Sequence, residues 1–69
     1  MNQELKEKII EVLKTGDKTS TEIMRELLKQ DVNFNAVEFR ETLAEMVREG
    51  IVEKYPVYET KRFYFRVKR

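Results

Sequence analysis

The hydropathy pattern of this chain changes its period at Gly50. Before Gly50, apolar residues recur every three to four positions, which is the spacing of amphipathic helices. After Gly50, apolar and polar residues alternate, and β-branched and aromatic residues predominate, as in strands. The pattern predicts a mainly helical α+β fold in which three helices precede a pair of strands. With 69 residues, the whole chain (1–69) is expected to form a single domain.

The first two helices are marked by an apolar stripe and a cap. The first is expected over residues 4–14, and Gly16 after it is a plausible stop. Thr19 and Glu22 stand three residues apart, which is the capping-box pattern at the start of a second helix that runs to about residue 30. The apolar stripe of the first helix is Leu5, Ile9, Val12 and Leu13, and the apolar residues of the second are Ile23, Met24, Leu27 and Leu28.

The third helix carries the clearest boundary signals. Asn35 is a suitable cap, Glu38 stands three residues later to return the bond, and Gly50 follows the last turn. Phe34, just before the cap, is expected to pack on Phe39 as a hydrophobic staple. The residues expected to face the core are Phe39, Leu43, Met46 and Val47.

Two strands are expected after Gly50. The first covers residues 51–58 and contains Pro56, which favours a sheet edge because proline has no backbone N–H. Residues 59–62 form the turn. The return strand is expected to have an apolar face (Phe63, Phe65, Val67) and a cationic, aromatic face (Tyr64, Arg66, Lys68).

The composition excludes several classes of functional site. The chain has no Cys and no His, so disulfides, Cys/His zinc sites, and Cys–His or Ser–His–Asp catalysis are excluded. Two glycines are too few for a phosphate-binding Walker loop or a dinucleotide-binding fingerprint. We therefore expect a protein that is not an enzyme and that binds no cofactor, metal or small-molecule ligand.

The sequence contains no long apolar segment. No stretch approaches the ~18 apolar residues of a membrane span, and the first residues carry no signal-peptide pattern. A cytoplasmic protein without membrane contact is expected. Charged residues make up 39% of the chain, which weakly favours a thermophilic source with many surface ion pairs.

The formal net charge of +1 conceals an uneven distribution. Residues 54–69 hold six Lys or Arg and one acid, a net charge of +5, whereas residues 1–53 hold eight Lys or Arg and twelve acids, a net charge of −4. A basic strip interleaved with Tyr64 is typical of a surface that neutralises phosphates by releasing counterions. The same cations also protect an edge strand from aggregation, but six exceed what that role needs. We favour phosphate binding.

Two segments give the chain a resemblance to a known superfamily. Leu43–Val52 is similar to the motif Leu-x-x-Leu-x-x-x-Gly-hydrophobic-Val, with Met46 in place of the second Leu. Arg62–Val67 is similar to a basic, aromatic return strand of a wing. With the order of elements, they make the chain resemble the winged helix-turn-helix superfamily. The resemblance implies a three-helix bundle followed by a two-stranded antiparallel β-hairpin wing. It also implies binding of double-stranded DNA, with the third helix in the major groove.

The third helix fits that implication only in part. A helical wheel with Phe39 inward puts Glu41 and Glu45 on the opposite face with Val37, Ala44 and Arg48, where carboxylates would repel phosphates. Its N-terminal end is compatible with limited base contact, although Asn35 is more simply a helix cap. The start of the second helix, with Lys18, Ser20 and Thr21, is a further candidate site for a phosphate. The full set of candidate DNA contacts is Lys18, Ser20, Thr21, Asn35, Arg40, Lys54, Lys61, Arg62, Tyr64, Arg66, Lys68 and Arg69.

Two functions are consistent with these features. The first is a small DNA-binding transcriptional regulator that grips duplex phosphates with its basic wing and C-terminal tail. The alternative is a protein–protein interaction module of a transcription or replication assembly, which would use the acidic face of the third helix. A homodimer is a further expectation, because Ile10 lies beside the core stripe of the first helix. Ile10 could equally be a core-edge residue of a monomer.

Overall fold

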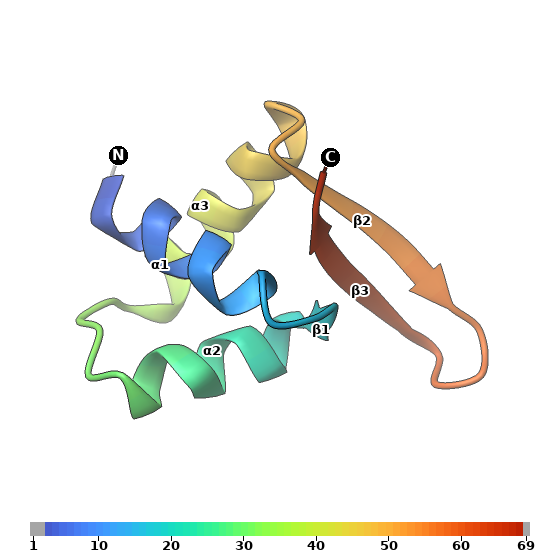
Figure 1. Cartoon of the computed structure of the whole chain (residues 1–69), viewed down its shortest axis with the longest axis horizontal. Helices are drawn as coiled ribbons and strands as arrows, with labels where there is room; N and C mark the ends of the chain where they lie inside the picture. Colours follow the sequence, from blue (N-terminus) through green and yellow to red (C-terminus); the bar gives the residue numbers. More distant parts are fainter. Residues whose placement is uncertain (1–2, 69) are drawn as a thin grey trace.

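The computed structural model describes residues 3–68, and its elements follow the predicted order (Figure 1). They are α1 (Gln3–Leu13), β1 (Lys18–Thr19), α2 (Ser20–Lys29), α3 (Ala36–Arg48), β2 (Val52–Val57) and β3 (Arg62–Val67). The three helices pack together, and the β2–β3 hairpin extends to one side with its turn pointing away from them (Figure 1). The mainly helical α+β class is confirmed, and the topology is compatible with a winged helix. Within residues 3–68, no helix is long and apolar enough to cross a membrane.

The core forms where the apolar faces of the helices meet the base of the hairpin. Each fully buried aliphatic or aromatic side chain contributes roughly 1.5–3 kcal/mol to stability. Ile10 is partly buried and packs against the edge of this core. The buried apolar residues are Leu5, Ile9, Val12, Leu13, Ile23, Leu27, Phe39, Leu43, Met46, Val52 and Phe65.

Two predicted core faces need correction. In α3, Thr42 is buried, whereas Val47 is only partly buried. The buried face of the helix is centred between Phe39 and Met46, and Val47 lies at the edge of that face. In β3, Phe65 is buried but Phe63 is exposed. The hairpin extends to one side of the helices (Figure 1). Phe63 pairs with Pro56 near the turn end of the hairpin and is 52% exposed, so the core does not cover its ring.

The predicted helix starts are confirmed. Thr19 Oγ1 accepts a hydrogen bond from the backbone N–H of Glu22 at 3.2 Å, and a Glu22 carboxylate oxygen accepts one from the Thr19 N–H at 2.8 Å. Asn35 Oδ1 accepts the N–H of Glu38 at 2.7 Å at the start of α3. The rings of Phe34 and Phe39 pack with centroids 5.8 Å apart, as a hydrophobic staple requires.

The predicted two-stranded antiparallel hairpin is confirmed, and a short strand that was not predicted, β1, extends the sheet to the order β1-β3-β2. Lys18 of β1 pairs with Phe65, and Thr19 pairs with Tyr64. A two-residue strand carries no hydropathy period, so the sequence pattern did not reveal it. The predicted edge position of Pro56 is confirmed, since β2 lies at the edge of the sheet. Through β1, the hairpin is hydrogen-bonded to the chain just before α2.

Both α2 and α3 end in a turn that needs a left-handed residue. After α3, Gly50 has φ +79°, and the N–H groups of Ile51 and Gly50 donate to the carbonyls of Met46 and Val47 at 3.0 and 3.1 Å. After α2, Asp31 occupies the same position with φ +57°. These hydrogen bonds form the Schellman motif, which favours glycine because other L residues meet a steric penalty there.

We expect Gly50→Ala to lower the free energy of unfolding by about 1 kcal/mol, because an L residue is forced into left-handed backbone. An added Cβ at Gly50 meets no atom within 4 Å, so the effect isolates the backbone term. Asp31→Gly is the reciprocal control and should raise stability. Urea unfolding of the three proteins measures both effects, and an unchanged midpoint for Gly50→Ala would contradict this account of the turn.

The capping box predicts an acid-sensitive contribution to stability. The hydrogen bond from the Thr19 N–H holds the pKa of the Glu22 carboxyl below its usual value. Because the pKa of Glu22 is lower in the folded state, its ionised carboxylate stabilises the protein, and this contribution is fully present above the ordinary glutamate pKa of about 4.3. The contribution is lost as the pH falls through the lowered pKa of the folded state. We expect the stability advantage of the wild type over Glu22→Gln to shrink over that acidic range. Thermal unfolding of both proteins between neutral and acidic pH tests it, and a constant difference would refute it.

Candidate nucleic-acid interface

A concave surface lies between α2, α3 and the β2–β3 hairpin. It consists of two hollows of about 510 and 530 Å³, which share Ser20, Lys54 and Phe65. Ser20 belongs to the first turn of α2, and Lys54 and Phe65 are cross-strand partners in the hairpin. We call this surface the basic groove, because its lining includes five cations from three elements: Arg25, Arg40, Arg48, Lys54 and Arg62.

None of the five cations of the basic groove forms an ion pair within residues 3–68, although Arg25 is near enough to Glu22 to help lower the pKa of that carboxyl. Four of the five are arginines, whose planar guanidinium group suits bidentate phosphate contacts. Lys54 also lies over the ring of Phe63, with its Nζ 4.5 Å from the ring centroid. The groove therefore presents positive charge that the described fold does not neutralise.

The predicted acidic face of α3 is corrected at Glu45. Val37, Glu41, Ala44 and Arg48 are exposed as expected, but Glu45 is half-buried. Its carboxylate forms an ion pair with Lys6 of α1 at 3.3 Å, and Glu49 pairs with the same ammonium at 3.1 Å. The hydrogen bond to Glu49 and that to Glu45 raise the pKa of Lys6. Because α1 packs against the side of α3 that carries Glu45, the charge of Glu45 is neutralised by Lys6. Glu41 remains on the exposed face of α3.

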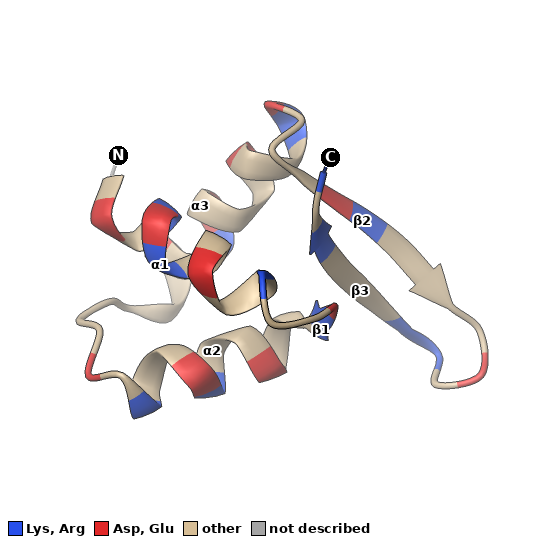
Figure 2. Cartoon of the chain, viewed as in Figure 1, with Lys and Arg blue, Asp and Glu red and all other residues tan. Residues whose placement is uncertain are grey.

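The basic strip predicted along the hairpin is divided between its two faces. Strand register places Lys54 opposite Phe65 and Arg66 opposite Glu53, and neighbouring positions of a strand point to opposite sides. Arg66 donates a hydrogen bond to Glu53 at 2.9 Å, and its guanidinium lies 5.0 Å from the centroid of the Tyr55 ring. Figure 2 shows basic positions recurring along β3, but they do not form one surface.

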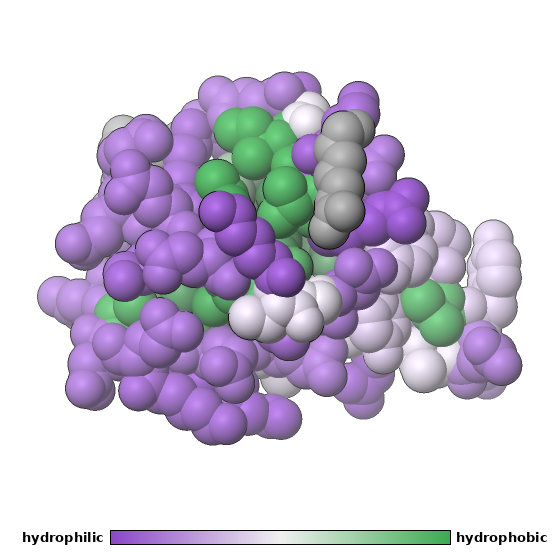
Figure 3. All heavy atoms as spheres, in the orientation of Figure 1, coloured by the Kyte–Doolittle hydropathy of each residue, from purple (hydrophilic) through white to green (hydrophobic). Residues whose placement is uncertain are grey.

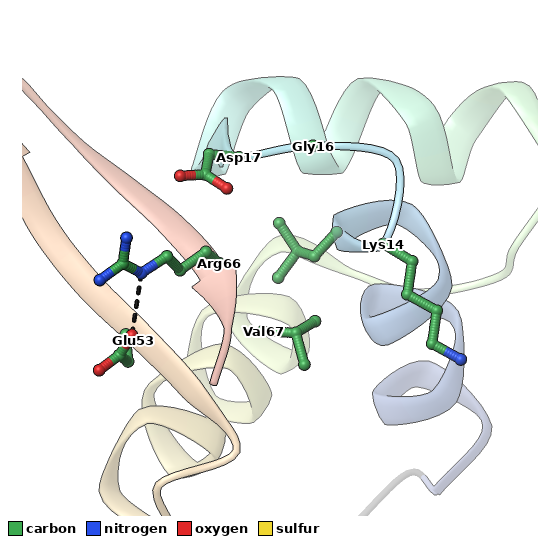
Figure 4. A pocket seen from close by; sticks show the side chains of 7 residues that line it. Lys14, Gly16, Asp17, Glu53, Arg66 and Val67 are labelled. Carbon is green, nitrogen blue, oxygen red and sulfur yellow. Dashed lines mark hydrogen bonds and ion pairs between the residues drawn. The ribbon is translucent and has the colours of Figure 1, made fainter. Parts of the chain in front are cut away.

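The second face of the hairpin holds a polar network beside α1. The hydroxyl of Tyr55 donates to the carboxylate of Asp17, which raises the pKa of Tyr55, and the Tyr55 ring stacks on Tyr64 with centroids 6.2 Å apart. Figure 4 shows Asp17, Arg66 and Glu53 around a shallow hollow on this side, with the ion pair between Arg66 and Glu53. In the same orientation as Figure 1, the visible face is mostly hydrophilic around a central hydrophobic patch (Figure 3).

Of the other predicted contacts, two line the basic groove and the rest that the structure describes are not part of its lining. Ser20 and Thr21 line the groove beside Arg25. Asn35 is exposed but uses its side-chain oxygen to cap α3. Lys18 lies in β1, Lys61 lies in the hairpin turn with φ +57°, and Lys68 is exposed after β3. Arg69 lies outside the described residues.

Sequence reasoning missed three residues of the basic groove. Arg25 follows Thr21 by four positions, so helical spacing could have grouped it with the start of α2. Arg48 was placed on the exposed face of α3 but was not named as a contact. Phe63 was assigned to the core, and no sequence signal indicates how far the hairpin extends beyond the helices.

The groove has no features of a metal centre. Within residues 3–68, no three His, Cys, Asp or Glu side chains are close enough to hold a metal ion.

Searches of protein-family profiles, curated proteins and solved structures found no significant match to this chain.

Proposed function

We propose that this protein binds double-stranded DNA through the basic groove and acts as a small transcriptional regulator. The observation that carries the proposal is the convergence of five cations without ion pairs, from α2, α3 and the hairpin, on one concave surface. Charges of one sign that line a concave surface act together, because a cleft focuses their field and raises the local concentration of an anionic ligand.

The third helix contributes two of these cations on one exposed face. Arg40 and Arg48 are two turns apart, about 12 Å along the helix axis, and Ala44 lies between them. A small residue between two arginines allows the helix to approach a phosphate backbone closely. Pairing of Glu45 with Lys6 supports the proposal further, since it reduces the repulsion expected from this helix. Asn35, at the start of α3, is the candidate for limited base contact.

Lys54 and Arg62 of the hairpin both line the groove, and in this proposal both contact phosphates there. Strand alternation puts Lys54 on the groove face and Arg62 on the face of Tyr64 and Arg66, so Arg62 lines the groove from its position at the start of β3, beside the turn. Arg66 and Tyr64 stabilise the hairpin from its other side through Glu53 and Tyr55. The turn residue Lys61 and the exposed Lys68 extend the positive field around the groove.

We expect a labelled duplex of random sequence to bind at low salt and to dissociate as salt is added. Each neutralised phosphate contributes about −0.9 to the slope of log K against log salt concentration, so five contacts give a slope of about −4.5. Replacing both Arg40 and Arg48 with Gln should make the slope less negative by about two units. Fluorescence anisotropy titrations at several salt concentrations measure both quantities.

The matched control for this experiment is the double variant Lys8→Gln with Lys29→Gln. It changes the net charge equally, but these lysines lie outside the groove and pair with Glu11 and Glu26. The control should keep the wild-type slope. Absence of duplex binding by the wild type at low salt would overturn the proposed function, and an equal effect of the two double variants would overturn the assignment to the groove.

The environments of the two glutamates on α3 predict different effects on DNA affinity. Glu41 is exposed and has no ion pair within residues 3–68, whereas Glu45 is neutralised by Lys6. We expect Glu41→Gln to tighten duplex binding about twofold, the ratio for one charge about 10 Å from a phosphate in water. Glu45→Gln should have a smaller effect in the same titration. A larger effect for Glu45→Gln would contradict the outward position of Glu41.

The alternative, a protein-interaction module, is supported by one observation. Val37 is 55% exposed beside Glu41, which leaves an apolar and acidic surface at the start of α3. The acidic face that this function requires is smaller than the sequence indicated, because Glu45 is paired. Under this alternative, changing Glu41 to Lys would abolish partner capture, whereas the DNA-binding proposal expects the same variant to bind a duplex more tightly.

A further inference from the structure

Phe63 is an exposed aromatic residue at the edge of a charged surface. The residue is 52% exposed, although its position in β3 gives it the same orientation as the buried Phe65. The ammonium of Lys54 lies over its ring, and Arg62 precedes it in the strand. Exposing an aromatic ring to water is unfavourable. Since the described fold leaves half of Phe63 uncovered, a ligand that covers it would gain binding energy.

The hollow around Phe63 combines three kinds of chemical group. Its volume of about 510 Å³ lies within the roughly 300–1,000 Å³ of small-molecule sites. An aromatic ring offers a stacking surface, the cations Arg25 and Arg62 attract phosphates, and the hydroxyls of Ser20 and Thr21 offer hydrogen bonds. A nucleotide presents the complementary set, namely a flat base, a phosphate and sugar oxygens.

We propose that this hollow binds an unpaired nucleotide of a DNA strand, with its base stacked on Phe63 and its phosphates on Arg25 and Arg62. The inference rests on the proposed function and specifies its ligand: a duplex that carries a single-stranded extension. In a continuous duplex the faces of the bases are covered by their neighbours, so Phe63 would gain no stacking partner. At the end of a duplex, an unpaired base is free to enter the hollow.

The position of Phe63 distinguishes stacking from insertion into the duplex. A side chain that wedges between base pairs must project from the surface. Phe63 instead lies on the groove side of β3, opposite Pro56, and the turn beyond it carries Tyr58, which is 85% exposed. The ring therefore lines the hollow from a position in β3 before the turn, where a base that enters the groove can stack on it.

The test compares a blunt duplex with the same duplex extended by a short thymidine tail. Stacking of one base on an aromatic ring raises affinity about fivefold or more. The wild type should therefore bind the tailed duplex at least about fivefold more tightly than the blunt duplex. A tail of abasic nucleotides carries the same phosphates without bases and should lose the preference. Phe63→Ala should also lose it while still binding the blunt duplex. Tyr58→Ala removes a comparable aromatic residue outside the hollow and should keep it.

A second measurement detects the stacking directly. The chain has no Trp, so Phe63→Trp introduces one fluorophore at the site. Its fluorescence should be quenched by the thymidine-tailed duplex and much less by the blunt or abasic-tailed duplex. Equal binding of blunt and tailed duplexes, or a preference that persists in Phe63→Ala, would overturn this inference and leave the proposed function standing. Failure of every duplex to bind at low salt would overturn the proposed function itself.

Discussion

The arrangement of the molecule depends on Thr19, which belongs to two elements at once. Its backbone pairs with Tyr64 as part of β1, and its side chain and N–H close the capping box with Glu22 at the start of α2. Thr19 is buried, whereas Glu22 is exposed, so the capping-box hydrogen bonds are partly shielded from water. Through this residue the hairpin is held against the first turn of α2. Ser20 and Phe63 consequently line the same hollow, although they are distant in the sequence.

Ion pairing determines where the charge of this protein is available. The pair of Lys6 with Glu45 joins α1 to α3, and that of Arg66 with Glu53 joins the two strands of the hairpin. Exposed pairs of this kind contribute little to stability, typically below about 1 kcal/mol. Their larger effect is on the surface potential: Lys6 neutralises Glu45 on α3, while the cations of the basic groove form no ion pair within residues 3–68. A chain with a net charge of only +1 thus presents a concentrated basic surface.

The two proposals assign different roles to neighbouring parts of one groove. The α3 part offers Arg40 and Arg48 on an exposed helix face and suits the regular phosphates of a duplex. The part beside Phe63 adds an aromatic ring and a hollow, which suit an unpaired base. Lys54 lines both parts and also contacts the Phe63 ring. A DNA end would therefore engage both parts, with the duplex on α3 and its single-stranded tail against the hairpin.

The sequence by itself determined the local structure: the caps at Thr19 and Asn35, the turn at Gly50 and the change from helix to hairpin. These features depend on residues a few positions apart, so their spacing alone specifies the backbone and the side that each residue faces. The sequence also predicted the basic hairpin and three of the five groove cations, namely Arg40, Lys54 and Arg62. Only the tertiary structure decided the pairing of β1, the neutralisation of Glu45 by Lys6, the separation of Arg66 from Lys54 and the exposure of Phe63. Each of these features depends on how far one helix or strand extends past another and on which of their sides are in contact. Both are set by packing between segments that are distant in the sequence.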